Sequence, residues 1–209
     1  NNNSKNWFSI NQKFFNDHPS YRFNITSDPI SDKIFKKIEN NSIKLGSITE
    51  SSQGIILYKT KKDSLENKFT SFNQKDLSWK KLLRGTNIGR YETKWTGEYV
   101  QYGKWLWSSR DEKFFNKQKI ILQALRNKSL SRRLIATFDD EKYYNAHNLA
   151  NIISKENNSY SLYFILSIFN SKPINFWYKM HFPNVNINPN DFREIPIPQI
   201  SFDKSNNLQ

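Results

Sequence analysis

Arginine and asparagine side chains gather in two short stretches in the middle of the chain. The first stretch surrounds two glycines and contains Arg84, Asn87 and Arg90. The second stretch runs over residues 126–133 and contains Arg126, Asn127, Lys128, Arg132 and Arg133. An arginine fork pairs with O6 and N7 of guanine, and an asparagine amide pairs with N6 and N7 of adenine. These residue types indicate contacts with the edges of DNA bases.

The positive charge of the chain is concentrated in the same region. The 209 residues carry 32 Lys and Arg against 19 Asp and Glu, a formal net charge of +13. Residues 80–133 hold 14 basic and 4 acidic side chains, whereas residues 134–209 hold 6 and 7. The 27 asparagines and the excess of Lys over Arg are typical of an AT-rich genome, but codon usage does not explain where the charge lies. A local cluster of cations indicates phosphate binding, which releases counterions and depends on salt.

Two predicted strands position the second stretch. The apolar runs over residues 119–125 and 133–138 are typical of buried strands, so residues 126–132 form a loop carried by a rigid sheet. A third strand is predicted from Tyr143 to Ile153, and Tyr143, Asn145 and His147 alternate along one of its faces. The predicted DNA-binding residues are Arg84, Asn87, Arg90, Lys94, Lys104, Arg126, Asn127, Lys128, Arg132, Arg133, Tyr143, Asn145 and His147.

The remaining pattern predicts a mixed α/β (α+β) fold, a single domain with a twisted, largely antiparallel sheet and helices at the C-terminal end. A short helix begins near Asp28 or Ser31, and a strand is expected over residues 54–58. From Ser159 the apolar spacing becomes helical, and Pro173 suits the first turn of a further helix. We expect three parts: an irregular segment with a short helix (1–42), a sheet-rich recognition core (43–158) and a helical bracing segment with an edge strand (159–209).

The sequence lacks the motifs of common catalytic and cofactor sites. There is no cysteine, and His18, His147 and His181 are too far apart for an i,i+4 metal pair. No phosphate-binding glycine loop and no apolar run of membrane-spanning length occurs. A nuclease set of Asp63, Glu66 and Lys68 falls in a polar loop, and residues 139–141 fit a solvated turn. We therefore expect no catalytic, cofactor or metal residue here, and a cytoplasmic bacterial protein.

The order of short motifs resembles the TaqI-like C-terminal specificity domain. This domain is the target recognition module of N6-adenine DNA methyltransferases and of type IIG restriction-modification enzymes. The resemblance covers roughly residues 43–198, with Gln118 standing where the family usually has a proline. It is carried by Leu45-Gly46-Ser47-Ile48, Gly54-Ile55, the segment from Leu83 to Tyr91, Lys119-Ile120-Ile121-Leu122, the segment from Leu166 to Lys172, and Ile195-Pro196-Ile197-Pro198.

The resemblance implies recognition of double-stranded DNA without chemistry in this chain. A methyltransferase domain, in the same chain or as a separate subunit, would use S-adenosylmethionine to methylate an adenine, and the parent enzyme could also cleave DNA. Because the chain opens at Asn1 without a methionine and lacks a catalytic half, we expect a piece of a longer protein.

Two alternatives stay open. The chain could be half of a type I specificity subunit, which would scaffold separate catalytic subunits through residues 159–180. It could also be an aromatic-rich carbohydrate or protein binder whose charge reflects codon usage. Trp95, Trp105 and Trp107 are expected to be core or half-buried sheet residues rather than base-stacking platforms.

Overall fold

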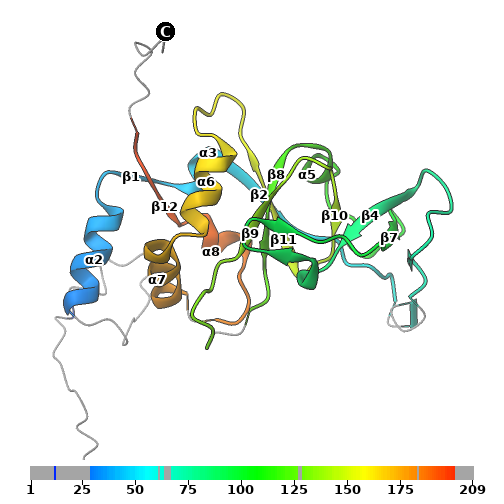
Figure 1. The fold of residues 1–209 in the computed structure, drawn as a ribbon, viewed down its shortest axis with the longest axis horizontal. Coiled ribbons are helices and arrows are strands. Elements are labelled where there is room, and N and C mark those ends of the chain that lie inside the picture. The colour runs from blue at the N-terminus through cyan, green and yellow to red at the C-terminus, as the bar shows by residue number, and fades with distance from the viewer. Residues whose placement is uncertain are drawn as a thin grey trace, which may run out of the picture.

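The computed structural model describes residues 12, 29–60, 62–63, 67–126, 129–182 and 184–200 (Figure 1). The helices in chain order are α2 (Pro29–Glu39), α3 (Leu45–Ile48), α5 (Lys113–Asn116), α6 (Leu162–Phe169), α7 (Lys172–His181) and α8 (Pro189–Phe192). The strands are β1 (Ser42–Lys44), β2 (Thr49–Gln53), β3 (Thr70–Ser71), β4 (Trp79–Leu83), β5 (Ile88–Gly89), β6 (Glu92–Thr93), β7 (Tyr99–Gln101), β8 (Lys119–Gln123), β9 (Ala136–Asp139), β10 (Tyr144–Asn145), β11 (Leu149–Ser154) and β12 (Pro196–Pro198).

A four-stranded antiparallel sheet in the order β2-β11-β8-β9 forms the centre of the molecule. Alternate residues of its central strands, such as Ile120, Leu122 and Ile152, pack into the main hydrophobic core. Helices α2, α6 and α7 contribute to the same core and lie to the left of the sheet in Figure 1. Burial of this apolar face stabilises the fold by about 25 cal/mol for each Å² removed from water.

The opposite face of the large sheet carries buried polar side chains. Lys119 on β8 and Asp139 on β9 are register partners, and their fully buried side chains form an ion pair. Lys119 also donates to the backbone carbonyl of Phe115 at 3.0 Å. Asp139 accepts hydrogen bonds from the backbone N–H groups of Glu141 and Tyr143, at 3.0 and 3.1 Å. Residues 139–141 therefore form a turn, but the prediction that this turn is solvated is wrong for Asp139, which is buried against Lys119.

A second sheet, in the order β10-β4-β7-β3, forms the right-hand part of the molecule in Figure 1. Its β4–β7 and β3–β7 pairs are antiparallel, whereas β10 runs parallel to β4. This sheet has its own hydrophobic core, separate from the main one, which includes Leu82, Val100, Phe115 and Tyr144. The strands β5 and β6 pair as a short hairpin, which lies in sequence between β4 and β7 of this second sheet. The mixed α/β fold with mostly antiparallel pairing is thus confirmed, with two four-stranded sheets and two two-stranded sheets among the described residues instead of one sheet.

Two strand predictions differ from the structure. The predicted strand over residues 143–153 is two strands, β10 and β11, because the chain leaves one sheet for the other between them. The predicted strand over residues 54–58 is wrong: β2 ends at Gln53, and Ile55 and Ile56 form only single bridges. A Cβ on Gly54 would meet the carbonyl oxygen of Ala146 at 2.3 Å, so only glycine fits where these segments cross.

The helical predictions are confirmed. Ser161 caps α6 by accepting a hydrogen bond from the backbone N–H of Phe164, and Ser171 caps α7 in the same way from Ile174. Pro173 lies in the first turn of α7, where no backbone donor is needed. Strand β12 pairs antiparallel with β1, which ties the C-terminal end of the described chain to the segment after α2. No helix of the described residues is long and apolar enough to cross a membrane.

Candidate DNA interface

The glycine turn after β4 is held by the side chain of Asn87. Its Oδ1 accepts a hydrogen bond from the backbone N–H of Arg84 at 2.7 Å, and its Nδ2 donates to the backbone carbonyl of Lys94 at 2.9 Å. The Asn87 side chain is buried. Although the sequence predicts Asn87 to contact a base, in this structure its amide closes a turn and does not reach the surface.

Arg84 forms a two-pronged ion pair with Glu98. Its Nε and Nη2 donate to the two carboxylate oxygens of Glu98, each at 2.6 Å. This hydrogen bonding raises the pKa of Arg84 above its ordinary value. Glu98 is buried, so the pair holds the end of β4 against the start of β7. Arg84 is only partly exposed, and two of its nitrogens donate to Glu98.

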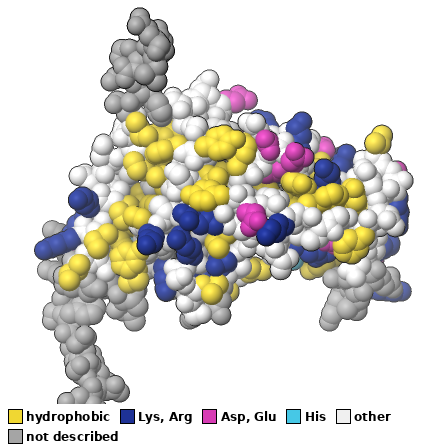
Figure 2. Space-filling model, in the orientation of Figure 1, with side chains coloured by type: hydrophobic (Ala, Val, Ile, Leu, Met, Phe, Trp, Pro, Cys, Tyr) yellow, Lys and Arg dark blue, Asp and Glu magenta, His cyan; other side chains and the backbone are white. Residues whose placement is uncertain are grey.

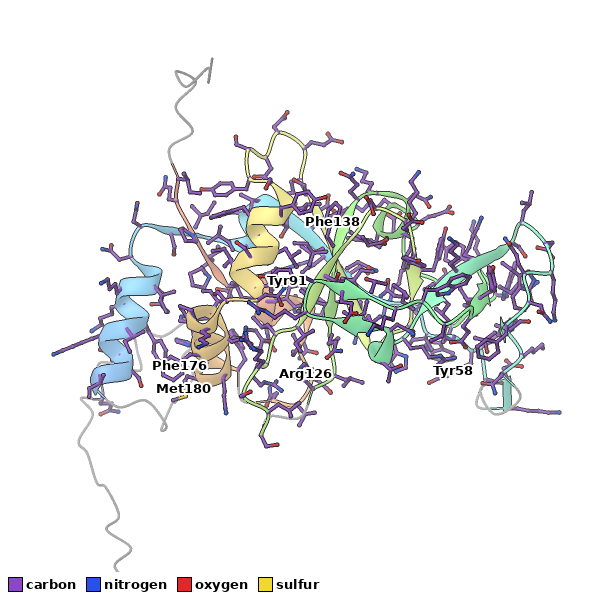
Figure 3. All side chains as sticks on the ribbon, in the orientation of Figure 1. Tyr58, Tyr91, Arg126, Phe138, Phe176 and Met180 are labelled. Carbon is purple, nitrogen blue, oxygen red and sulfur yellow. The ribbon has the colours of Figure 1, made fainter. Side chains whose placement is uncertain are left out.

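The β5–β6 hairpin presents an exposed arginine at its tip. The guanidinium carbon of Arg90 lies 4.9 Å from the centre of the Tyr91 ring, and both side chains are exposed. Tyr91 has a positive φ of 63° and donates its backbone N–H to the carbonyl of Ala136 at 3.0 Å. The tip is therefore anchored to β9, and Figure 3 shows Tyr91 near the middle of the molecule. Among the described residues, no ion-pair partner of Arg90 lies within 4.0 Å.

Gln123 at the end of β8 joins this turn to the arginine-rich loop. Its Nε2 donates to the backbone carbonyls of Gly85 and Ile88 at 2.9 and 2.7 Å. Its Oε1 accepts a hydrogen bond from Nη1 of Arg126. The two stretches that the sequence analysis singled out are thus brought together. Sequence reasoning missed this residue, because a glutamine at a strand end has no local signal for such a role.

The arginines of the β8–β9 loop bind backbone carbonyls. Arg126 donates to the carbonyl of Arg132 at 3.1 Å, and Arg132 donates to the carbonyl of Asn170, also at 3.1 Å. Arg133 is fully buried and donates to the carbonyls of Arg126 and Asn184. Burial lowers the pKa of both Arg126 and Arg133 from its ordinary value. These arginines organise the loop, and in this structure Arg133 presents no surface to DNA.

Asn127 and Lys128, at the centre of this loop, lie outside the described residues. Figure 3 shows Arg126 below Tyr91. The predicted DNA contacts of Asn127 and Lys128 stay predictions.

Two buried asparagines, Asn170 at the end of α6 and Asn175 in α7, fix the far side of the loop. Asn170 exchanges two hydrogen bonds with the backbone of Ala136: its Oδ1 accepts at 3.1 Å and its Nδ2 donates at 2.9 Å. Asn175 accepts from the backbone N–H of Leu134 at 2.8 Å. These amides satisfy backbone groups that a neighbouring strand would otherwise pair. Sequence reasoning assigned no role to them, since asparagine is abundant throughout the chain.

The residues predicted to alternate along one strand have three different environments. Tyr143 is half-buried, and burial raises the pKa of its hydroxyl. Asn145 on β10 is fully buried. His147 lies past the end of β10 and is exposed. Because β10 ends at Asn145, the three side chains do not form a common reading face.

Two of the three predicted lysines, Lys94 and Lys104, are at the surface. Lys94 forms an exposed ion pair with Glu92 at 2.9 Å, and Lys104 is exposed in the turn after β7. Further lysines that the prediction did not include lie on β4: Lys81 is exposed, and its Nζ is 5.2 Å from the centre of the Trp95 ring. Trp95 is half-buried, as expected, and its indole donates to the carbonyl of Glu98. Trp107 is 70% exposed, contrary to expectation.

A small pocket of about 130 Å³ opens beside the glycine turn. Arg84, His147 and Asn148 line it together with Tyr58 and Thr70. Its volume is well below the roughly 300–1,000 Å³ of typical small-molecule sites, so it suits one polar edge of a larger ligand. Among the described residues, no group of three or more His, Cys, Asp or Glu side chains could hold a metal ion.

Two mostly antiparallel sheets, braced by helices and carrying exposed cations on a hairpin and loops, define a domain suited to bind a polyanion. Residues 80–197, more than half of the chain, match the model of the TaqI-like C-terminal specificity domain. The chain belongs to this family, as its motifs indicated. Membership indicates DNA sequence recognition in restriction-modification and therefore a DNA partner. No curated protein matches the sequence.

Proposed function

We propose that this domain reads a short sequence of double-stranded DNA, so that a methyltransferase domain can methylate an adenine at N6. The catalytic domain lies in the same chain or in a separate subunit, and it uses S-adenosylmethionine. Family membership supports DNA recognition, and the exposed hairpin of Arg90 is the single structural observation that carries the assignment of a reading element. An exposed arginine on a rigid, anchored turn is well placed to enter a groove.

The surrounding cations support the same proposal. Four lysines lie close to the hairpin in sequence, on β4 and in the turns around β7. Three of them are exposed, namely Lys81, Lys94 and Lys104, and the fourth, Lys80, is half-buried. They would bind phosphates and fix the register of the domain on the duplex, while Arg90 reads a base. Arg84 and Arg133 are not part of this proposed surface, because one is paired with Glu98 and the other is buried.

A titration against duplex DNA at two salt concentrations tests DNA binding. Phosphate contacts predict that affinity falls steeply as salt rises, with a slope of about −0.9 for each phosphate neutralised. A carbohydrate or protein binder with incidental charge predicts no such slope. If affinity for DNA were absent or independent of salt, the proposed function would be wrong.

The variant Arg90→Ala tests the assigned reading element. We expect the affinity for a preferred sequence to fall by about 1–3 kcal/mol, with weaker discrimination at one base position. Lys37→Ala, which removes an exposed cation from α2, is the matched control and should change neither. Equal effects of the two variants would show that Arg90 acts only through its charge.

A further inference from the structure

The loop between β3 and β4 exposes two large apolar side chains. Leu77 is 87% exposed, more than any other large hydrophobic residue among those described, and Phe72 in the same loop is 70% exposed. A single exposed leucine is ordinary on a protein surface, but two apolar side chains on one short loop form a contact feature. The loop lies at the right-hand end of the molecule in Figure 1, at the opposite end from α2.

The backbone of this loop is ordered by its own polar residues. Oδ1 of Asp76 accepts hydrogen bonds from the backbone N–H and the hydroxyl of Ser78, at 2.7 and 2.5 Å. Nε2 of Gln74 donates to the carbonyl of Trp79 at 3.1 Å, and Lys75 lies over the Trp79 ring at 4.8 Å. The polar side chains thus fold back onto the loop while Leu77 faces outward. Such preorganisation lowers the entropic cost of contact with a partner.

The charge around the loop is complementary to DNA. Residues 67–81 contain four lysines and one acidic residue, Asp76, and the strand that follows the loop carries Lys80 and Lys81. Figure 2 shows lysine and arginine side chains interleaved with apolar ones at this end of the molecule. Apolar side chains flanked by cations are suited to a duplex, because the cations bind phosphates while the apolar group enters between stacked bases.

We propose that the β3–β4 loop is a wedge that inserts Leu77 between neighbouring base pairs of bound DNA, with Phe72 packing beside it. The proposal rests on the proposed DNA-reading function and extends it to deformation of the duplex. Unstacking a base step costs a few kcal/mol, and an inserted apolar side chain replaces the lost stacking contacts. A base whose stacking is already broken is easier to extrude from the helix, which a methyltransferase acting on that base requires.

The test uses a DNA duplex that is first selected from a randomised pool by its binding to the protein. The fluorescent base 2-aminopurine is then placed at successive positions of this duplex. We expect the parent protein to raise the fluorescence at one base step, because 2-aminopurine brightens when it is unstacked. Leu77→Ala should remove most of this increase. It should weaken binding by less than about tenfold, since the phosphate contacts remain. Phe72→Ala should reduce the increase in part.

Ile30→Ala is the matched control. It truncates an aliphatic side chain of 73% exposure on α2, at the other end of the molecule, and should leave the fluorescence unchanged. Because Leu77, Phe72 and Ile30 are all exposed, the midpoint urea concentration of unfolding should be the same for the three variants as for the parent.

The outcomes separate this proposal from the proposed function. Salt-dependent DNA binding without any fluorescence increase would overturn the wedge alone, as would an increase that persists in Leu77→Ala. A loss of binding to a methyltransferase domain in Leu77→Ala, with unchanged fluorescence on DNA, would mark the loop as a protein contact and also overturn the wedge. No DNA binding at all would overturn both proposals.

Discussion

Arg84 holds both carboxylate oxygens of Glu98, with two nitrogen–oxygen distances of 2.6 Å. The pair joins the segment before the glycine turn to the start of β7, so the β5–β6 hairpin between them has fixed ends. A guanidinium is suited to this position because its planar fork matches a carboxylate, which a lysine ammonium does not. An arginine that the sequence predicted to contact DNA thus positions the hairpin that carries Arg90.

Removing this arginine should destabilise the fold. Arg84→Ala leaves the buried Glu98 carboxylate without its partner, and we expect a loss of about 1–2 kcal/mol in the free energy of unfolding. Breaking a fully buried pair costs about 3–5 kcal/mol, and solvent screening at the partly exposed Arg84 reduces this. Urea denaturation measures the change. Lys94→Ala, which breaks an ion pair exposed at both ends, is the control, with an expected loss below about 0.5 kcal/mol.

Truncating Arg133 should lower the stability of the fold, whereas truncating Arg90 should lower the affinity for DNA. Arg133→Ala leaves two backbone carbonyls without their donor, and we expect it to lower the free energy of unfolding by about 2–4 kcal/mol. Arg90→Ala removes an exposed side chain and should change stability by less than about 0.5 kcal/mol, but it should weaken DNA binding. Urea denaturation and DNA titration, corrected for the folded fraction, separate the two. Unchanged stability in Arg133→Ala would contradict the structural role.

Asn170 should protect the start of β9 from local opening. Asn170→Ala removes both hydrogen bonds to Ala136, and we expect a loss of about 1–3 kcal/mol because the buried N–H of Ala136 loses its partner, whereas its carbonyl keeps the N–H of Tyr91. Hydrogen exchange should show faster exchange of the Ala136 amide. Asn190→Ala, an exposed asparagine on α8, serves as control and should leave that amide as slow as in the parent.

Alkaline pH should destabilise the second sheet through Tyr144. Its hydroxyl is buried and donates to Glu112 at 2.9 Å, and burial raises the pKa of Tyr144 above its ordinary value of 10.0. The folded state therefore keeps the proton more tightly than the unfolded state, so this contribution is complete below pH 10 and falls as pH rises above it. Urea denaturation at about pH 9 and about pH 11 should show the loss.

Tyr144→Phe tests the assignment. The variant cannot ionise at this position, so its stability should fall less between the two pH values than that of the parent. Tyr102 and Tyr143 also have raised pKa values because of burial, so part of the slope should remain. An identical slope in Tyr144→Phe would show that other tyrosines account for all of it.

Periodic apolar residues were sufficient to predict helices α6 and α7 and the central strand β8. The i, i+3, i+4 spacing from Leu162 marks α6, and Pro173 marks the first turn of α7. The run of apolar residues from Ile120 to Leu122 marks β8, which is buried on both faces. These elements are determined locally, because the period of the side chains that must be buried is a property of the segment itself.

Which arginines face solvent was decided only by the tertiary structure. Three arginines of one basic segment have different environments, although their residue type is the same. Arg84 is paired with Glu98, Arg90 is exposed and Arg133 is buried. Their partners come from elements far away in the chain, and no local pattern encodes a contact between Arg133 and Asn184. The sequence by itself determined the family, the fold class and the location of the charge. The folded chain decided which of these cations remain available to DNA, because burial and pairing depend on contacts between distant segments.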